Sequence, residues 1–508
     1  MLATTYTDSA APEGDEPPIT NLRVRTARGT IINSAFRAGL AVLGLINRVA
    51  VAAFLTREEF GLWGIILAVL VTLIWLKQVG IQDKYIQQRE PDQKLAFQKA
   101  FTIELVLSFA YFLLCCIALP LYALAYGHDE IILPGIVLAT AVILTSLQTP
   151  AWIPYRRMQY ARERVLMSVD PVVSIIGMVG LAAAGYGYWG LAIGAVIGSL
   201  AGAVVCVATS AYPLRIRFDR DTAREYVSFS WPLLGAGLSR MLVVQGSLLT
   251  ASRSLGLAAV AAIGLATNFA AFADRVNAIV SQTIYPAVCA VADRGEALLE
   301  VFVKSNRVSL MWSLPFGTGL ALFAGDLVHF VLGDEWQSAV GLLTALGVIA
   351  GLGQLAFNWS VFMRATNRTR PMFVASLLNV ASFALVSLPL MLEFGLTGWA
   401  IGFGTASLVQ IVARIYFLRS LFPRFDIVRH TVRALAPAVP PVAVVLGVRA
   451  VTDESSAAWV LGELALFVVA TLISTYLFER QLIREMVGYL RGRTTPAPSR
   501  AAIASPPA

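Results

Sequence analysis

The chain has 508 residues, of which 57% are hydrophobic and only 14% are charged, and its mean hydropathy is +0.71. Because a soluble protein carries about 25% charged residues, this composition excludes a soluble enzyme, a nucleic-acid-binding protein and a disordered scaffold for the chain as a whole. The net charge of +8 comes from 39 Lys and Arg against 31 Asp and Glu, and it suits the cytoplasmic loops of a membrane protein.

The chain opens with an acidic, proline-containing stretch, where we expect a disordered cytoplasmic tail, and fourteen long apolar runs follow. Each run has about the length that an α-helix needs to cross a bilayer, whereas barrel strands would be shorter and would alternate in polarity. The sequence therefore predicts an all-α, polytopic membrane protein with about 14 transmembrane helices. The runs are 30–55, 60–77, 98–120, 131–152, 166–185, 188–210, 228–251, 257–285, 308–332, 338–362, 372–392, 396–418, 434–451 and 457–478.

The distribution of basic residues predicts the orientation of these helices. Loops on the N-terminal side of the membrane hold nearly all of the Lys and Arg that lie outside the runs, and the opposite loops hold only Arg57, Arg253 and Arg449. By the positive-inside rule, both termini are then cytoplasmic, which also requires an even number of spans.

An internal repeat divides the chain into two parts. Residues 186–200 read YGYWGLAIGAVIGSL and residues 394–408 read FGLTGWAIGFGTASL, with seven identities at an offset of 208. Since each copy of six spans starts and ends on the same side, the copies are parallel repeats, and we expect two six-helix lobes followed by two extra C-terminal helices. The predicted segments are a tail (1–28), a first lobe (29–210), a linker (211–227), a second lobe (228–420), spans 13 and 14 (421–479) and a tail (480–508).

Four arginines within the runs are the strongest candidates for function, because a charge at the centre of a span costs about 2.5–3.5 kcal/mol. Arg37 and Arg48 are eleven residues apart and share one helix face in the first run, Arg240 lies near the middle of the seventh, and Arg275 lies in the eighth. Guanidinium groups bind phosphate through paired hydrogen bonds, so these residues predict a cavity for an anionic substrate. The alternative for Arg37 and Arg48 is that each side chain extends to the nearer membrane surface.

Two acids in the runs are candidates for ion coupling or for ion pairs. Glu104 lies near the inner end of the third run, where a structural pair with Lys99 or Arg37 is favoured over a proton site. Asp274 precedes Arg275 and is the main acid of the eighth run.

Enzymatic chemistry is not indicated. The sequence contains no HExxH, CxxC or Walker-type motif, its three histidines are far apart, and its four cysteines lie in or beside apolar runs, so we predict no metal and no cofactor. The loops are too short to form an extramembrane catalytic domain. These features favour a transporter over a membrane-embedded transferase or polymerase.

Several motifs together resemble those of bacterial polysaccharide-biosynthesis flippases. The chain is similar to the Wzx-type branch for O-antigen and exopolysaccharide within the multidrug/oligosaccharidyl-lipid/polysaccharide (MATE-like) superfamily. The resembling segments are FLTREEFGL at 54–62, VGI at 79–81, IQ at 86–87, RRM at 156–158, YGYWG at 186–190, RFD at 217–219, FSWPLLG at 229–235 and YPA at 285–287.

This resemblance implies an alternating-access flippase in the bacterial inner membrane. Its substrate would be a polyprenyl-diphosphate-linked oligosaccharide for O-antigen, capsule or exopolysaccharide, with cavity arginines on the diphosphate. Membrane lipids and a polysaccharide polymerase or export machinery are the other implied partners. Spans 13 and 14 would help to hold the lipid tail, as they do in related peptidoglycan-precursor flippases, although no motif here carries that role.

Two alternatives remain open at this point. A cation-coupled multidrug antiporter of the same fold would depend on Glu104 and Asp274, although the first run carries arginines where that branch carries a mid-membrane acid. A structural partner of an assembly complex would tolerate neutral residues at all four arginines.

Overall fold

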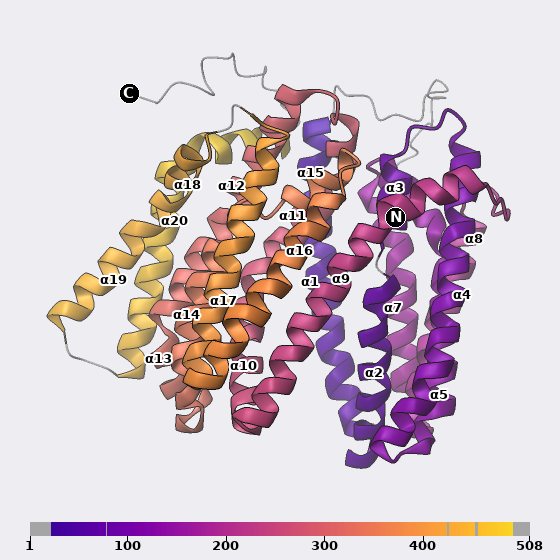
Figure 1. The fold of residues 1–508 in the computed structure, drawn as a ribbon, viewed down its shortest axis with the longest axis horizontal. Helices are drawn as coiled ribbons and strands as arrows, with labels where there is room; N and C mark the ends of the chain where they lie inside the picture. Colours follow the sequence, from indigo (N-terminus) through magenta and orange to yellow (C-terminus); the bar gives the residue numbers. More distant parts are fainter. Residues whose placement is uncertain (1–21, 78, 424–425, 453–455, 491–508) are drawn as a thin grey trace, which may run out of the picture.

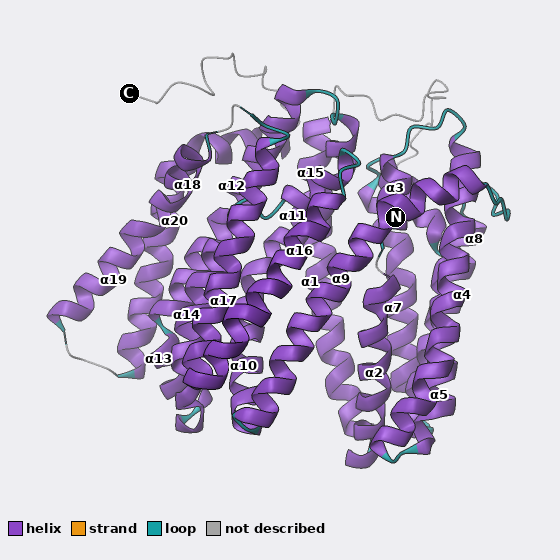
Figure 2. Ribbon diagram, in the orientation of Figure 1, coloured by secondary structure: helices purple, strands orange, loops and turns teal. Residues whose placement is uncertain are grey.

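We describe residues 22–77, 79–423, 426–452 and 456–490 of a computed structural model, and within these ranges the chain forms helices and no strand (Figures 1 and 2). The helices of the first half are α1 (Leu22–Phe54), α2 (Arg57–Lys77), α3 (Ile81–Gln87), α4 (Gln93–Tyr126), α5 (Ile132–Ser146), α6 (Trp152–Arg156), α7 (Tyr160–Ala183) and α8 (Gly187–Ala208). Those of the second half are α9 (Arg220–Ser254), α10 (Leu257–Ala270), α11 (Asp274–Ala290), α12 (Gly295–Leu322), α13 (Ala324–Leu327), α14 (Val340–Leu352), α15 (Trp359–Ala365), α16 (Arg370–Ser382), α17 (Leu388–Arg419), α18 (Ile427–Leu435), α19 (Val439–Val451) and α20 (Ala457–Leu490).

The all-α, multi-pass membrane architecture that the sequence predicts is confirmed. Within the described ranges, ten helices are long and apolar enough to cross a membrane, or eleven if the bent pair Gly295–Leu322 and Ala324–Leu332 is one span. The count of fourteen stays a prediction. Three predicted spans account for the difference between eleven and fourteen. The first run, which lies in α1, is not among the candidate spans, the apolar helix at Trp336–Leu352 is short, and one continuous stretch, Arg370–Arg419, covers two predicted spans.

Two helix groups form the two lobes, and they stand side by side in Figure 1. One apolar core, which includes Ile66 and Leu191, draws its buried residues from 62–195, and a second, which includes Leu343, draws them from 251–400. Each lobe therefore has its own core. The two groups meet through α1, which packs on both α7 and α11, and through the pairing of α2 with α9.

The repeat found in the sequence forms a tight helical hairpin in each lobe. Gly187 and Gly395 adopt positive φ angles of 53° and 61° and mark the turns. In the first hairpin a Cβ on Gly194 would meet backbone atoms of Met178, and in the second a Cβ on Gly402 would meet Ser387. The close approach of the two arms explains why the repeat keeps glycine at these positions. The bend at Gly395 also divides α17 into two parts. The part before the bend belongs to one arm of the second hairpin, and the part after it belongs to the other arm.

The lobes are joined at the end of the bundle that holds α3, α15 and α18, which we call the basic end (top of Figure 1). Buried residues from both halves of the chain, among them Tyr85, Phe97, Tyr285 and Phe362, share one core there. At the opposite end, the cores of the two lobes are separate. The described structure is therefore closed at the basic end.

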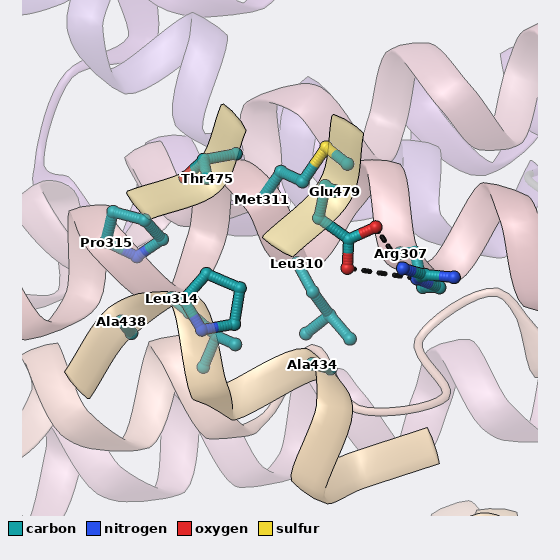
Figure 3. Close-up of a pocket in the computed structure, with 10 residues that line it drawn as sticks. Arg307, Leu310, Met311, Leu314, Pro315, Ala434, Ala438, Thr475 and Glu479 are labelled. Atoms are coloured by element: carbon teal, nitrogen blue, oxygen red, sulfur yellow. Dashed lines mark hydrogen bonds and ion pairs between the residues drawn. The ribbon is translucent and has the colours of Figure 1, made fainter. Parts of the chain in front are cut away.

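Ion pairs hold the last two long helices against the second lobe at both ends. At the basic end, Arg307 of α12 contacts both carboxylate oxygens of Glu479, which lies at a kink in α20 (Figure 3). At the other end, Arg449 of α19 pairs with Asp326 at 2.7 Å and with Glu463 at 2.8 Å. These contacts attach α19 and α20 to the second lobe rather than leaving them free in the lipid.

The predicted segment boundaries stay predictions, and some of them fall within helices. Helix α1 begins at Leu22, inside the predicted tail, and α9 begins at Arg220, inside the predicted linker. Helix α20 continues to Leu490, which lies in the predicted C-terminal tail. Residues 1–21 and 491–508, which make up the rest of the two tails, are outside the described ranges.

Candidate functional site

Two polar contacts join α1 to α11 between the lobes. The Arg37 guanidinium donates to Gln282 Oε1 at 2.8 Å, and one turn earlier on α1 the Asn33 amide donates to the Thr283 hydroxyl at 2.7 Å. Since residues four apart share a helix face, Arg37 and Asn33 lie one above the other on the side of α1 that faces the second lobe. Arg37 is half-buried, and its guanidinium contacts α11 of the second lobe.

A buried arginine from α7 completes the first-lobe side of this contact. Arg164 is only 8% exposed; its Nε donates to Asn33 Oδ1 at 2.6 Å and lies 3.0 Å from Glu163 Oε2. Its Nη2 is buried without a hydrogen-bond partner, and its guanidinium lies over the Phe36 ring. A buried arginine with an unused donor has capacity to bind an anion.

The third cation comes from α11, two helical turns from Gln282. Arg275 is exposed and lies over the Phe272 ring at 5.0 Å. Arg164 and Arg275 are close enough to Arg37 for their positive charges to act on it. We call Arg37, Arg164 and Arg275 the arginine cluster. Arg37 and Arg164 both lie beside Asn33, with Glu163 as the adjacent acid, and Arg275 lies about two turns away along α11.

Residues 50–341 match the family described as polysaccharide biosynthesis proteins. The chain belongs to the polysaccharide biosynthesis protein family. It is 24% identical over 345 residues to the lipopolysaccharide biosynthesis protein WzxC of Escherichia coli strain K12, and the match covers 65% of this chain and 68% of WzxC. The family resemblance that the sequence predicts is confirmed.

Solved structures share the fold of this polysaccharide biosynthesis protein. A multidrug resistance MATE family transporter in an outward-facing conformation superposes with a TM-score of 0.67 at 14% identity, over 82% of this chain and 98% of that one. A MOP superfamily transporter from Pyrococcus furiosus gives 0.66 at 12% identity, over 80% and 97%. The protein therefore has the fold of the MATE transporters.

The other two predicted arginines lie apart from the cluster or outside the described side chains. Arg240 of α9 is exposed and its guanidinium lies 5.1 Å from the Trp75 ring of α2, so it bridges the lobes at another point. The backbone of Arg48 lies in α1, but its side chain is outside the part of the structure that we describe.

The predicted acids have different surroundings. Glu104 pairs with Lys77 of α2 at 2.9 Å, so the partners proposed from the sequence, Lys99 and Arg37, were wrong because helix depth does not fix which neighbour a side chain faces. Lys99 instead pairs with Glu90 and Asp219. The Glu104–Lys77 pair is nearly buried within the first lobe and has the geometry of a structural ion pair.

Asp274 opens a chain of polar contacts through the second lobe. Its carboxylate accepts a hydrogen bond from Gln354, which in turn accepts one from Asn277, while Asn306 donates to the Gln354 carbonyl at 3.1 Å. Arg414 of α17 donates to the Gly353 main-chain carbonyl, next to Gln354, at 2.6 Å. Asp274 is exposed and thus forms the open end of this network.

Sequence reasoning missed two charged residues. Arg164 was counted with a basic loop because it precedes the fifth apolar run, and no periodicity distinguished it. Asp170 lies within that run and was open to detection as an intramembrane acid; it accepts from Gln148, Ser174 and Ser199 at 2.8–3.1 Å. Among the described residues, no group of three or more His, Cys, Asp or Glu side chains is placed to hold a metal.

Proposed function

We propose that the protein flips a polyprenyl-diphosphate-linked oligosaccharide repeat unit from the cytoplasmic to the outer leaflet of the bacterial inner membrane. The product would serve the synthesis of an exopolysaccharide or a lipopolysaccharide, as O-antigen or capsule. The observation that carries this proposal is the arginine cluster between the lobes. Three guanidinium groups from three helices offer paired donors and positive charge to a diphosphate.

The arginine cluster would compensate the negative charge of the diphosphate. A diphosphate leaving water for the space between two lobes loses its hydration, and the cost falls if guanidinium donors replace the water. Arg164 Nη2 is buried and lacks a hydrogen-bond partner in the described structure, so a phosphate oxygen that reaches it when the lobes move would gain a donor without breaking an existing bond. No bond of the substrate is made or broken, and we assign no catalytic residue.

The closed basic end supports an assignment of state. With this end cytoplasmic, as the positive-inside rule predicts, the described structure is closed to the cytoplasm and corresponds to an outward-facing state. Alternating access then requires the contacts between α1 and α11 to break on opening to the cytoplasm. Membrane lipids and a polysaccharide polymerase or export system are the further partners of this proposal.

A reconstituted flipping assay tests this proposal. Purified protein in liposomes receives a fluorescent polyprenyl-diphosphate oligosaccharide, and exposure to an impermeant quencher reports flipping. We expect Arg37→Ala, Arg164→Ala and Arg275→Ala each to slow flipping about tenfold, which corresponds to the loss of one charge-assisted hydrogen bond. The matched control is Arg162→Ala, because Arg162 lies on the same helix as Arg164 but is exposed and donates only to the Thr209 carbonyl.

Two results would overturn the proposal. Wild-type protein that flips no lipid-linked sugar but expels cationic dyes in exchange for cations would establish the multidrug antiporter instead. Flipping that survives in all three cluster variants, each shown to be folded, would remove the arginines from the mechanism.

A further inference from the structure

A polar cavity of about 850 Å³ opens at the basic end, where the two lobes meet. Its volume lies in the range of sites for drug-sized ligands, about 300–1,000 Å³. We call it the basic-end vestibule. Its charged lining is Lys84, Arg89, Glu90, Glu225, Asp293 and Arg368.

The vestibule has one wall from each lobe, and contacts between the walls hold the lobes together. Lys84 of the first lobe is 2% exposed, and its ammonium lies 2.6 Å from Glu225 and 3.4 Å from Asn367 Oδ1, both in the second lobe. Arg89 pairs with Asp293 in the same way. The site that would hold a ligand is therefore built from the contacts that close this end.

The lining distinguishes the vestibule from the arginine cluster. Three cations (Lys84, Arg89 and Arg368) face three acids (Glu90, Glu225 and Asp293), and amides and hydroxyls fill the rest. Such a balanced wall gives a diphosphate no net attraction. The carboxylates, amides and hydroxyls together offer the hydrogen-bond acceptors and donors that sugar hydroxyl groups need.

The vestibule is also separated from the arginine cluster along α11. Cys289 lines the vestibule, and Gln282, the partner of Arg37, lies seven residues earlier, about 10 Å along the helix axis. At the level of Gln282, the Tyr160 hydroxyl donates to the Thr283 carbonyl and Tyr155 donates to the Gln282 carbonyl. The two sites thus lie at different levels along α11.

We infer that the basic-end vestibule is a binding site for the saccharide head group, occupied before the lobes part; this inference rests on the proposed function. Sugar hydroxyl groups would form hydrogen bonds to Glu225 and Asn367 in place of Lys84. They would likewise bind Asp293 in place of Arg89. Occupancy therefore weakens the contacts that close the basic end. The head group itself favours opening, and the diphosphate then reaches the arginine cluster.

The test uses a saccharide without lipid or phosphate. The probe is the reducing oligosaccharide released by mild acid from the lipid-linked pool of the source organism, titrated by calorimetry into the full-length protein in nanodiscs. We expect wild type to bind it and Glu225→Gln and Asp293→Asn each to bind about tenfold more weakly. Both side chains are well exposed, at 57% and 73%. Because Glu225→Gln removes the counter-ion of the buried Lys84, the thermal midpoint of each variant is measured beside its binding, and only folded protein is titrated. Asp221→Asn, on α9 but not in the vestibule lining, is the matched control and should bind like wild type.

The flipping assay, run on the same variants, separates the two proposals. We expect the vestibule variants to need more lipid-linked substrate for half-maximal flipping, with the maximal rate retained. Wild type that flips the lipid-linked substrate but binds no free saccharide, or vestibule variants that bind and flip like wild type, would overturn the vestibule inference and leave the flippase proposal intact. Wild type that flips nothing would overturn the flippase proposal itself.

Discussion

Asp83 of α3 and Arg364 of α15 form an ion pair across the boundary between the lobes. The Arg364 guanidinium also lies 5.2 Å from the Tyr285 ring, and the Tyr285 hydroxyl donates to the Asp83 carbonyl at 2.8 Å. Three helices from two lobes thus meet at one cation. This pair is more enclosed than Arg89–Asp293 on the same boundary, since Asp83 and Arg364 are 21% and 23% exposed whereas Arg89 and Asp293 are 50% and 73% exposed.

Asp83→Asn should destabilise the closed state. Because the variant leaves a largely enclosed guanidinium without its counter-ion, we expect a loss of about 1–3 kcal/mol, seen as a lower thermal midpoint in detergent. The matched variant Asp293→Asn breaks an exposed pair on the same boundary and should cost less than about 0.5 kcal/mol. Equal losses in the two variants would show that enclosure does not set the strength of these contacts.

Glu104 should contribute to stability and not to transport. Glu104→Gln leaves Lys77 unpaired inside the first lobe, so we expect a lower melting temperature, largely restored when Lys77→Met is added. Flipping by the double variant should match wild type. A transport-dead, stable Glu104→Gln/Lys77→Met double variant would assign Glu104 to coupling.

Asp274→Asn, by contrast, alters the open end of the second-lobe network and should slow flipping in a protein that melts normally.

The glycines of the two hairpins should tolerate no side chain. We expect Gly194→Val and Gly402→Val each to cost more than about 2 kcal/mol, because the added atoms meet backbone of the opposite arm. Gly404→Ala is the control: its Cβ would lie 3.4 Å from the Ile349 side chain, an ordinary contact. The yield of monodisperse protein and its thermal midpoint measure the effect. Wild-type behaviour of both valine variants would contradict the close packing of the arms.

Breaking the Arg307–Glu479 pair should be costly, whereas replacing it should not. Glu479 is 2% exposed, so Arg307→Met alone leaves a buried carboxylate, and we expect a loss of about 3–5 kcal/mol. The double variant Arg307→Met/Glu479→Leu removes both charges and should recover most of that loss. A thermal-shift cycle over the two single variants and the double variant checks this; simple additivity would show that the two residues do not interact.

Sequence patterns predicted the fold well because membrane helices must satisfy their own backbone and keep an apolar surface. The offset of 208 also identified the equivalent hairpins, since the spacing of Gly187, Gly190 and Gly194 is imposed by close helix packing. The number of spans was harder to predict from composition, because a π-helical turn at Phe383–Ser387 and the bend at Gly395 interrupt α16 and α17 without a polar loop.

The candidate site was predicted only in part. Depth along a helix follows from sequence, and this brought Arg37 and Arg275 to notice as intramembrane cations. The direction of each side chain around its helix depends on how helices pack, so the sequence did not reveal that Arg240 lies beside Trp75 or that Glu104 faces Lys77. Arg164 was missed because it lies near the start of α7, before the fifth apolar run. Its sequence surroundings are those of a basic loop, although its side chain is buried.

The ion pairs at both ends of α19 and α20 have a mechanical consequence. Helices fastened to one lobe at two distant points travel with it as a single body, so any rocking of the lobes carries this pair through the surrounding lipid. Helix α20 also touches α1, which packs against the first lobe. Because α20 would move with the second lobe, its contact with α1 would have to shift when the lobes move. The lipid around this contact would then be displaced.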